Sequence, residues 1–305
     1  WQNESMWRFV QITDTHLASE RNGVWNNKFL CSMMPDVMAC LKTDLARLNP
    51  DFLLVTGDIV SSHSRAAVFQ ARDMLESLEV PYYPAGGNHD FCSMESRAWF
   101  LEAYAQRLPA CNTVYTFVHK NLRFCVLDPW WVWRDGSMMP FAEPDTSEPG
   151  EKKTRDTRWA LPPEQFVWLE SVLNAFPDLP TCIATHYPVT PLPEHFYQPE
   201  YNFAGSLENG DLLAGVLAKY PQVIAVFSGH VHTNAISENS GVLHVCTSAL
   251  PEYPVEFREV EVYKDRIEIK THGLSDPAFA RRSLIPSREY ISGTHGDRSA
   301  VARFI

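Results

Sequence analysis

Residues 51–58 have the sequence DFLLVTGD, in which an apolar run ends on a glycine and a carboxylate. The run is short and continuous, as in a strand buried on both faces of a sheet, so we predict a strand over 51–56. This strand delivers Gly57 and Asp58 to its carboxyl end, where the glycine lets the backbone turn sharply. A single aspartate in such a place is commonly a turn or helix-cap residue, so its meaning depends on how the other strands end.

Four other predicted strands end in polar clusters of the same kind. The clusters are Asp14-Thr15-His16 after 7–13, Gly87-Asn88-His89-Asp90 after 80–85, Thr185-His186 after 181–185, and Gly229-His230-Val231-His232 after 222–228. Helices are predicted between the strands, over 36–48, 64–79, 163–176 and 211–220. Strands that alternate with helices are typical of an α/β sheet, and sites in such sheets lie at the carboxyl ends of the strands.

The remaining segments favour β-hairpins. Alternating runs joined by short turns predict hairpins over 113–128, 234–247 and 255–272. We therefore predict an α/β fold in which two sheets pack face to face as a β-sandwich, with helices outside both. One domain is expected over 1–272, with a Trp- and Pro-rich inserted loop at 129–160, and a polar tail is expected over 273–305.

Apart from Asp90, the five clusters supply two carboxylates, one amide and five imidazoles, a set suited to divalent cations. Asp14 and His16 are two residues apart, as are His230 and His232, and side chains at i and i+2 of an extended segment share a face. Asp58 has two oxygens and can bridge two ions. The clusters thus predict two divalent metal ions side by side, of Mn, Fe, Zn or Co, a device that attacks phosphate esters with water.

In this order, the five clusters resemble the calcineurin-like metallophosphoesterase superfamily, and Asp14-Thr15-His16-Leu17 is similar to the bacterial class III cyclic nucleotide phosphodiesterases and glycerophosphodiesterases. The resemblance runs from Asp14 to His232 and implies a β-sandwich flanked by helices. It also implies the metal ligands, which are Asp14, His16, Asp58 and His232 for the first ion and Asp58, Asn88, His186 and His230 for the second.

Residues beside the metals are expected to handle the substrate. The resemblance makes His89 a non-ligand histidine near the substrate oxygens, where it stabilises the transition state or protonates the leaving group. Asp90 follows it and is predicted to orient the His89 imidazole by a hydrogen bond, so both are candidate catalytic residues. The candidate substrate contacts are Asn88, His89 and Tyr187. Tyr187 stands where many bacterial relatives have a second histidine.

The predicted reaction is the hydrolysis of small phosphodiesters, of the cyclic nucleotide or glycerophosphodiester type, and of phosphomonoesters, by in-line attack of a metal-bridging hydroxide. A nuclease and a nucleotide or lipid pyrophosphohydrolase are the alternatives within the superfamily. A non-catalytic interaction scaffold is a more remote one. The net charge of −11 argues against a nucleic-acid polymer as partner, because such binding relies on rows of Lys and Arg.

Composition sets the remaining expectations. The chain has 305 residues, of which 45% are apolar, enough for a sizeable core. Seven cysteines without a CxxC pair predict reduced thiols and a cytoplasmic location. No apolar run reaches the roughly 18 residues of a membrane span, and no signal peptide is expected. Assembly into a homo-oligomer is left open. Arg97 is predicted on the outer face of a helix.

Overall fold

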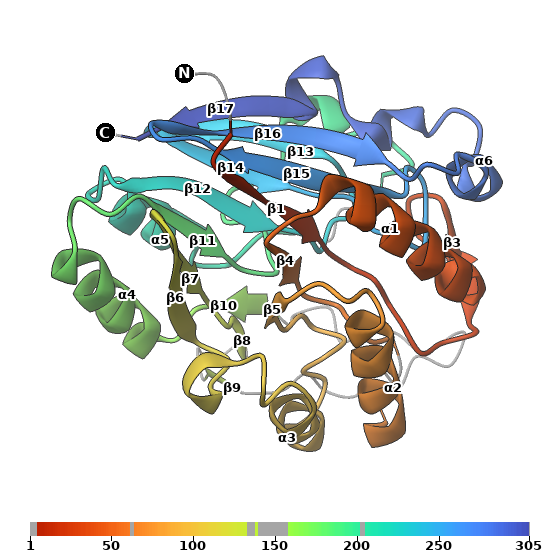
Figure 1. The fold of residues 1–305 in the computed structure, drawn as a ribbon, viewed down its shortest axis with the longest axis horizontal. Helices are drawn as coiled ribbons and strands as arrows, with labels where there is room; N and C mark the ends of the chain where they lie inside the picture. Colours follow the sequence, from red (N-terminus) through yellow and green to blue (C-terminus); the bar gives the residue numbers. More distant parts are fainter. Residues whose placement is uncertain (1–4, 62–63, 133–137, 140–157, 202–204, 305) are drawn as a thin grey trace.

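The computed structural model describes residues 5–61, 64–132, 138–139, 158–201 and 205–304. Two six-stranded sheets form its centre (Figure 1). The first contains, in spatial order, β17 (Ser299–Arg303), β16 (Arg266–Gly273), β15 (Glu256–Val262), β1 (Trp7–Ile12), β4 (Phe52–Thr56) and β5 (Tyr82–Ala85). The second contains β13 (Ala235–Asn239), β14 (Val242–Cys246), β12 (Val223–Ser228), β11 (Thr181–Ala184), β7 (Leu122–Val126) and β6 (Tyr115–His119).

Two small sheets complete the β-structure. They are the pair β2 (Asn22–Val24) with β3 (Lys28–Leu30), and the triplet β10 (Arg158–Ala160), β8 (Trp130–Val132) and β9 (Met138–Met139). The triplet lies within the predicted inserted loop of 129–160, most of which is outside the described residues.

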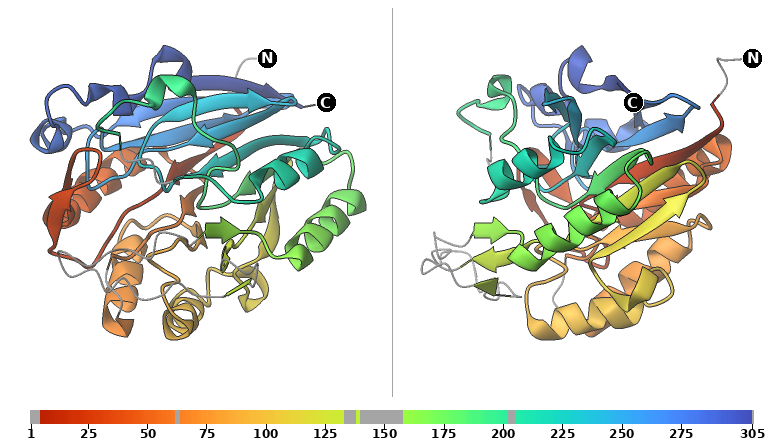
Figure 2. Two further views of the ribbon diagram at one scale, coloured as in Figure 1. Left: turned by 180° about the vertical axis from the view of Figure 1, so that it is seen from behind. Right: turned by 90° about the vertical axis from the view of Figure 1, so that its left-hand side faces the viewer.

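Helices cover the outer faces of the two large sheets. The α-helices are α1 (Met34–Leu48), α2 (Arg65–Glu76), α3 (Met94–Ala103), α4 (Pro163–Ala175), α5 (Gly210–Leu217) and α6 (Ala278–Ser283). The short 3₁₀ helices are η1 (Cys31–Met33), η2 (Pro109–Cys111), η3 (Glu194–Phe196), η4 (Glu289–Ser292) and η5 (His295–Asp297). Figure 2 shows α2, in orange, toward one side of the molecule and α4, in green, along the other. The predicted α/β sandwich with helices outside both sheets is confirmed.

The helices form where local chemistry supports them. Ser64 caps α2 by accepting a hydrogen bond from the main-chain N–H of Ala67, and α4 begins at Pro163, where the missing N–H is no loss. The bounds of helix α3 were not predicted, because its apolar and polar residues are not segregated onto opposite faces. Its start is nevertheless encoded by a reciprocal capping box between Ser93 and Ser96.

Aromatic side chains join the two large sheets. The rings of Phe9 on β1 and Phe52 on β4 stack with centroids 5.2 Å apart, and Phe124 of the second sheet meets Phe9 edge-on at 5.2 Å. These rings are at most 1% exposed, and each contributes on the order of 2 kcal/mol by burial.

Gln11 then connects the sheets directly beneath their carboxyl ends. Its amide donates to Thr56 Oγ1 of β4 at 2.9 Å and to the carbonyl oxygen of Ser228 of β12 at 3.0 Å. The ends of β1, β4 and β12, which carry three of the five polar clusters, are therefore fixed to one another by a buried side chain.

The C-terminal residues, expected as a polar tail, are structured. Strand β17 pairs antiparallel with β16 and forms one edge of the first sheet (Figure 1). Arg298 forms an ion pair with Glu256 of β15, and the Arg288 side chain donates to the carbonyl oxygen of Asn26 at 2.9 Å. The segment therefore wraps back onto the sandwich and reaches the loop of the β2–β3 hairpin.

The structure also shows the positions of Arg97 and of the cysteines. Arg97 lies on the inner face of α3, only 8% exposed, where it pairs with Asp128 and covers the Phe91 ring at 4.0 Å, so its predicted outer position was wrong. All seven cysteines are free thiols. Within the described ranges, no helix combines the length and apolar composition needed to cross a membrane.

Candidate metal centre

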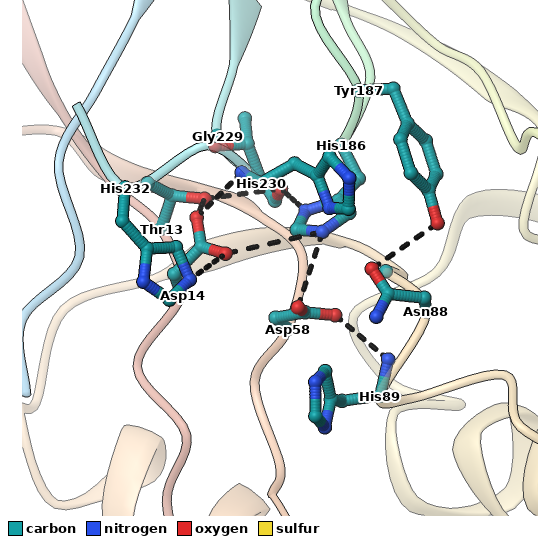
Figure 3. Close-up of polar contacts among 12 residues, drawn as sticks. Thr13, Asp14, Asp58, Asn88, His89, His186, Tyr187, Gly229, His230 and His232 are labelled. Carbon is teal, nitrogen blue, oxygen red and sulfur yellow. Dashed lines mark hydrogen bonds and ion pairs between the residues drawn. The ribbon is translucent and has the colours of Figure 1, made fainter. Parts of the chain in front are cut away.

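The five polar clusters meet where the two sheets face each other. Strands β1, β4 and β5 run parallel in the first sheet, and β7, β11, β12 and β14 run parallel in the second. The loops that follow β1, β4, β5, β11 and β12 therefore reach the same region, and their side chains point toward one another (Figure 3). The geometry brings together all the residues predicted as ligands.

The backbone reaches this arrangement by an unusual route. Strand β1 ends at Ile12, and Asp14 and His16 have left-handed φ values of 48° and 44°. His230 and His232 repeat the pattern with 68° and 53°. Asp14 and His16 do lie in one group of donors, whereas His230 and His232 lie in two different groups, and the predicted extended backbone was wrong at both pairs. A left-handed conformation at a non-glycine residue costs roughly 1–2 kcal/mol, and such strain is concentrated at functional sites.

The first group of donors consists of Asp14, His16 and His232, whose ligand atoms all lie within 4.8 Å of one another. Asp14 Oδ2 accepts hydrogen bonds from Thr13 Oγ1 at 2.7 Å and from the main-chain N–H of His230 at 2.9 Å. Its other oxygen, Oδ1, faces His232 Nε2 at 3.2 Å. One oxygen of Asp14 is thus used to fix the carboxylate, and the other points into the site.

The second group consists of Asp58, His186 and His230, again within 4.8 Å. The Nδ1 atom of His186 lies 2.8 Å from the carbonyl oxygen of Thr56, which turns Nε2 toward Asp58 Oδ2 at 3.3 Å. That Asp58 oxygen is also 3.8 Å from His16 Nε2 of the first group. Asp58 Oδ2 therefore lies between the two groups of donors.

Several donor atoms of the site lack a hydrogen-bond partner, which suits them to binding cations. The Asp14 carboxylate, the His16 ring and the His186 ring are at most 2% exposed. Asp14 Oδ1, both ring nitrogens of His16 and Nε2 of His186 are buried without a hydrogen-bond partner. Asp14 Oδ1 and His186 Nε2 do have ion-pair partners, in His232 Nε2 at 3.2 Å and Asp58 Oδ2 at 3.3 Å. An unsatisfied buried polar atom costs roughly 1–3 kcal/mol, a cost that bound metal ions would remove.

The pKa values of two histidines show that the carboxylates of the site favour positive charge nearby. Burial alone would lower the pKa of His186 and His232, but the carboxylates of Asp58 and Asp14 outweigh it and raise these pKa values to about 9 and about 10. Burial and the neighbouring His89 instead lower the pKa of His16 to about 3. His16 is therefore neutral at physiological pH, whereas His186 and His232 would release a proton on binding a metal ion.

Asn88 and Tyr187 lie at the edge of the second group. The hydroxyl of Tyr187 donates to Asn88 Oδ1 at 3.2 Å (Figure 3). The Tyr187 ring is 1% exposed and stacks on Trp159 at 4.8 Å. This contact orients the Asn88 amide. Direct contact of either residue with a substrate stays a prediction.

His89 borders both donor groups. Its main-chain N–H donates to Asp58 Oδ1 at 2.9 Å, and its ring centroid is 4.7 Å from that of His16. The ring nitrogens of His89 and His16 and a carboxylate oxygen of Asp58 also lie within 4.8 Å of one another. The geometry therefore allows His89 to act beside the metals, as predicted, or to bind one, and metal content distinguishes the two.

Asp90 is buried between two loops of the site, and its predicted hydrogen bond to the His89 imidazole stays a prediction. Its carboxyl group is 1% exposed and accepts hydrogen bonds from the main-chain N–H groups of Gly87, Ile59 and Val60. Burial and the neighbouring Asp58 raise its pKa to about 7, against the effect of these N–H donors. These contacts join the loop after β4 to the loop after β5, which is a structural role that the sequence did not suggest.

Sequence reasoning also missed residues that hold the ligands. Glu252, in the loop between β14 and β15, is fully buried and lies 2.6 Å from His232 Nδ1. Phe29 of β3 stacks on the His232 ring at 5.7 Å. Neither residue follows a predicted strand end, so no pattern pointed to them. Only the polarity of a glutamate between apolar neighbours in ALPEYP could have drawn attention to Glu252.

Comparison with known proteins agrees with this site. Residues 8–234 match the family model of the calcineurin-like phosphoesterases. The chain belongs to this family. It is thus a metal-dependent hydrolase of phosphoric esters, and the α/β sandwich is the fold of its structural neighbours.

Individual relatives are similar over most of their length. The chain is 27% identical to the glycerophosphodiester phosphodiesterase GpdQ of Enterobacter lignolyticus, over 75% of this chain and 72% of the relative. It is 25% identical to the 3′,5′-cyclic adenosine monophosphate phosphodiesterase CpdA of Escherichia coli K12, over 75% and 70%. A dimetal phosphatase from Danio rerio has a similar fold, with a TM-score of 0.69, 17% identity and coverage of 99% of this chain and 100% of that one.

Proposed function

We propose that this phosphoesterase holds two divalent metal ions and hydrolyses small phosphodiesters. The observation that carries the proposal is the position of Asp58 Oδ2, which lies 3.3 Å from His186 Nε2 of one donor group and 3.8 Å from His16 Nε2 of the other. A carboxylate between two sets of donors is the arrangement that a shared ligand requires.

The two ligand sets follow from the grouping of the donors. Asp14, His16 and His232, with Asp58, would hold the first ion, and His186 and His230, with Asp58, would hold the second. Asn88, which lies beside Asp58 in Figure 3, would complete the second set. Carboxylate, imidazole and amide donors together suit Mn, Fe, Zn or Co. When bound, a pair of such ions neutralises the charge of a phosphate group and lowers the pKa of a coordinated water to about 7.

The remaining chemistry belongs to side chains of the chain itself. The His89 main chain is held on Asp58 by its N–H, which keeps the imidazole beside the two groups of donors. An imidazole in that place can donate a proton to the leaving alcohol oxygen and so favour departure of the product. Tyr187 fixes Asn88 through its hydroxyl group and keeps the amide oxygen at the edge of the second set.

Small phosphodiesters are the proposed substrates for two reasons. The similar proteins named above act on a glycerophosphodiester and on a cyclic nucleotide, which share a phosphodiester group. The net charge of −11 disfavours long polyanions, whereas a small anion depends on the local field of the bound ions. Phosphomonoesters are proposed as secondary substrates, because paired ions recognise the phosphoryl group itself.

A hydrolysis panel tests this proposal. The purified protein, stripped of metal and then supplied with Mn²⁺, Co²⁺ or Zn²⁺, would be assayed on 3′,5′-cyclic AMP, glycerophosphoethanolamine, a nitrophenyl monoester, ADP-ribose and single-stranded DNA. We expect metal-dependent turnover, fastest on one of the first two compounds, and loss of at least 1,000-fold in kcat for Asp58→Ala. Turnover confined to ADP-ribose or DNA, or an active Asp58→Ala variant, would contradict the proposal.

A further inference from the structure

Glu252 is a fully buried carboxylate that contacts the ring of His232, one of the proposed metal ligands. Its Oε1 atom lies 2.6 Å from His232 Nδ1, on the side of the imidazole away from Asp14. We propose that Glu252 is a positioning residue that sets the tautomer and the orientation of His232. The inference rests on the ligand set of the proposed function and adds a residue outside it.

The hydrogen bond determines which nitrogen of His232 is available. A carboxylate oxygen can only accept, so the Nδ1 atom facing it must carry a hydrogen. The Nε2 atom is then the one that offers a lone pair to a metal, and it faces Asp14 Oδ1 at 3.2 Å. Carboxylates behind ligating histidines raise the basicity of the ring and fix its direction in many metal sites.

Glu252 can do this because its own position is fixed. Its second oxygen, Oε2, accepts a hydrogen bond from the main-chain N–H of Asn27 at 2.7 Å. Asn27 lies in the turn of the β2–β3 hairpin, whose Phe29 stacks on the His232 ring with an interplanar angle of 15°. The imidazole is thus held at one edge by Glu252 and on one face by Phe29.

The hairpin is in turn anchored by the C-terminal segment. The Asn27 side-chain oxygen accepts from the main-chain N–H of Ile285 at 2.8 Å, and Arg288 donates to the Asn26 carbonyl oxygen. A continuous set of hydrogen bonds therefore connects residues after α6 to His232 through Asn27 and Glu252. This gives the segment beyond the last predicted strand a defined part in the metal centre.

The contacts require a carboxylate and not merely a polar residue of the same shape. Two donors, the Nδ1–H of His232 and the N–H of Asn27, approach two different oxygens of Glu252. A glutamine at this position has one oxygen and one NH₂ group, so it can accept from only one of these donors and opposes the other. Glu252→Gln is therefore a nearly isosteric variant that breaks the proposed function of the residue.

The test measures the binding of Mn²⁺ alone to metal-free wild-type protein, Glu252→Gln and a control, Glu256→Gln. Glu256 is also a buried carboxylate, 8% exposed, but its oxygens pair with Arg298 and the Asn234 side chain. We expect two sites in the wild type and a loss of about 10- to 100-fold in affinity at one site of Glu252→Gln. Glu256→Gln should keep both affinities while lowering the urea midpoint.

A second measurement reports the tautomer directly. In Zn²⁺-loaded, ¹⁵N-labelled wild-type protein, the His232 Nδ1 resonance should have the shift of a protonated nitrogen and show a strongly downfield proton. In Glu252→Gln that proton should move upfield and exchange faster with water. Wild-type affinity and an unchanged Nδ1–H signal in Glu252→Gln would overturn the inference while leaving the metal centre intact. A wild type without two Mn²⁺ sites would overturn the proposed function and this inference together.

Discussion

The carboxyl group of Asp90 lies against the main chain of Ile59, whose N–H is 3.2 Å from both of its oxygens. Oδ1 also accepts from the N–H of Val60 at 3.1 Å, and Oδ2 from the N–H of Gly87 at 2.9 Å. Asp90 therefore connects the loop that carries Asp58 to its own loop. The distance between the proposed bridging ligand and Asn88 depends on this connection.

Replacement of Asp90 by alanine should weaken both the fold and the metal site. Three buried N–H groups lose their acceptor, and the expected loss is about 3 kcal/mol in the free energy of unfolding by urea. Mn²⁺ affinity should fall as well, because the two loops are no longer joined. Asp297→Ala is the matched control, since Asp297 is 2% exposed and accepts from the N–H groups of Thr294 and Ile236 away from the site. Equal Mn²⁺ affinities in the two variants would show that Asp90 has no part in the centre.

The sequence predicted the fold well where hydrophobic pattern and topology act together. Strands such as β4 are continuous apolar runs because both of their faces are covered, and their carboxyl ends must meet when the strands are parallel. The pattern failed for α3, whose polar and apolar residues are mixed, and for β17, which is a half-exposed edge strand with little apolar signal. In both cases tertiary contacts supply the stability that the local sequence does not encode.

The candidate site was predicted through its strand-end clusters, but its support was not. Asp14 and His16 were placed together on the assumption of extended backbone, whereas left-handed φ values bring them together. Arg97 was placed outside because charge usually indicates exposure, yet Asp128 pairs with it in the interior. Residues such as Glu252 act through contacts distant in sequence, and a single chain carries no periodic signal for such contacts.

His89 provides a test that separates a catalytic histidine from a ligand. His89→Ala should retain two bound metal ions per chain, measured by inductively coupled plasma mass spectrometry after dialysis. Its kcat should fall about 100-fold or more for an alkyl diester, whose leaving group needs a proton, and much less for a nitrophenyl diester.

Two results would contradict this role of His89. Equal losses for good and poor leaving groups would exclude proton donation. Loss of one metal ion would instead assign His89 to the ligands, which its proximity to His16 and Asp58 allows.

Gly57 offers a steric test of the second donor group. It has a φ of 97°, and a methyl group added there would lie 2.5 Å from His186 Nδ1. Gly57→Ala should therefore displace His186 and reduce Mn²⁺ affinity, besides the roughly 1–2 kcal/mol cost of the left-handed backbone. Gly241→Ala is the control, because Gly241 has a φ of 81° in the β13–β14 turn and has no atom within 4 Å of the added methyl group. If both variants lose stability but bind Mn²⁺ like the wild type, the close packing of Gly57 on His186 is not needed for the site.

The burial of His244, away from the metal centre, predicts how the free energy of unfolding depends on pH. This histidine lies on β14 and lines a small cavity with Pro188, Leu192 and Cys246, and Cys246 is the other titratable group among the described residues of that lining. Burial lowers the pKa of His244 from 6.5 to about 4. The folded protein therefore keeps this imidazole neutral at a pH where the unfolded chain already binds a proton.

The sign of the effect follows from that difference in proton binding. The neutral His244 ring contributes to the free energy of unfolding. This contribution is fully present above pH 6.5, is lost as the pH falls toward about 4, and is absent below that value. Between pH 7 and pH 4, urea unfolding of the wild type should thus lose more stability than that of His244→Gln, by an amount on the order of 2 kcal/mol. His295→Gln, which changes an exposed histidine of η5, should follow the wild-type curve. Parallel pH profiles for the wild type and His244→Gln would mean that His244 is solvated in solution, and the burial of β14 beneath the 188–193 loop would then have to be reconsidered.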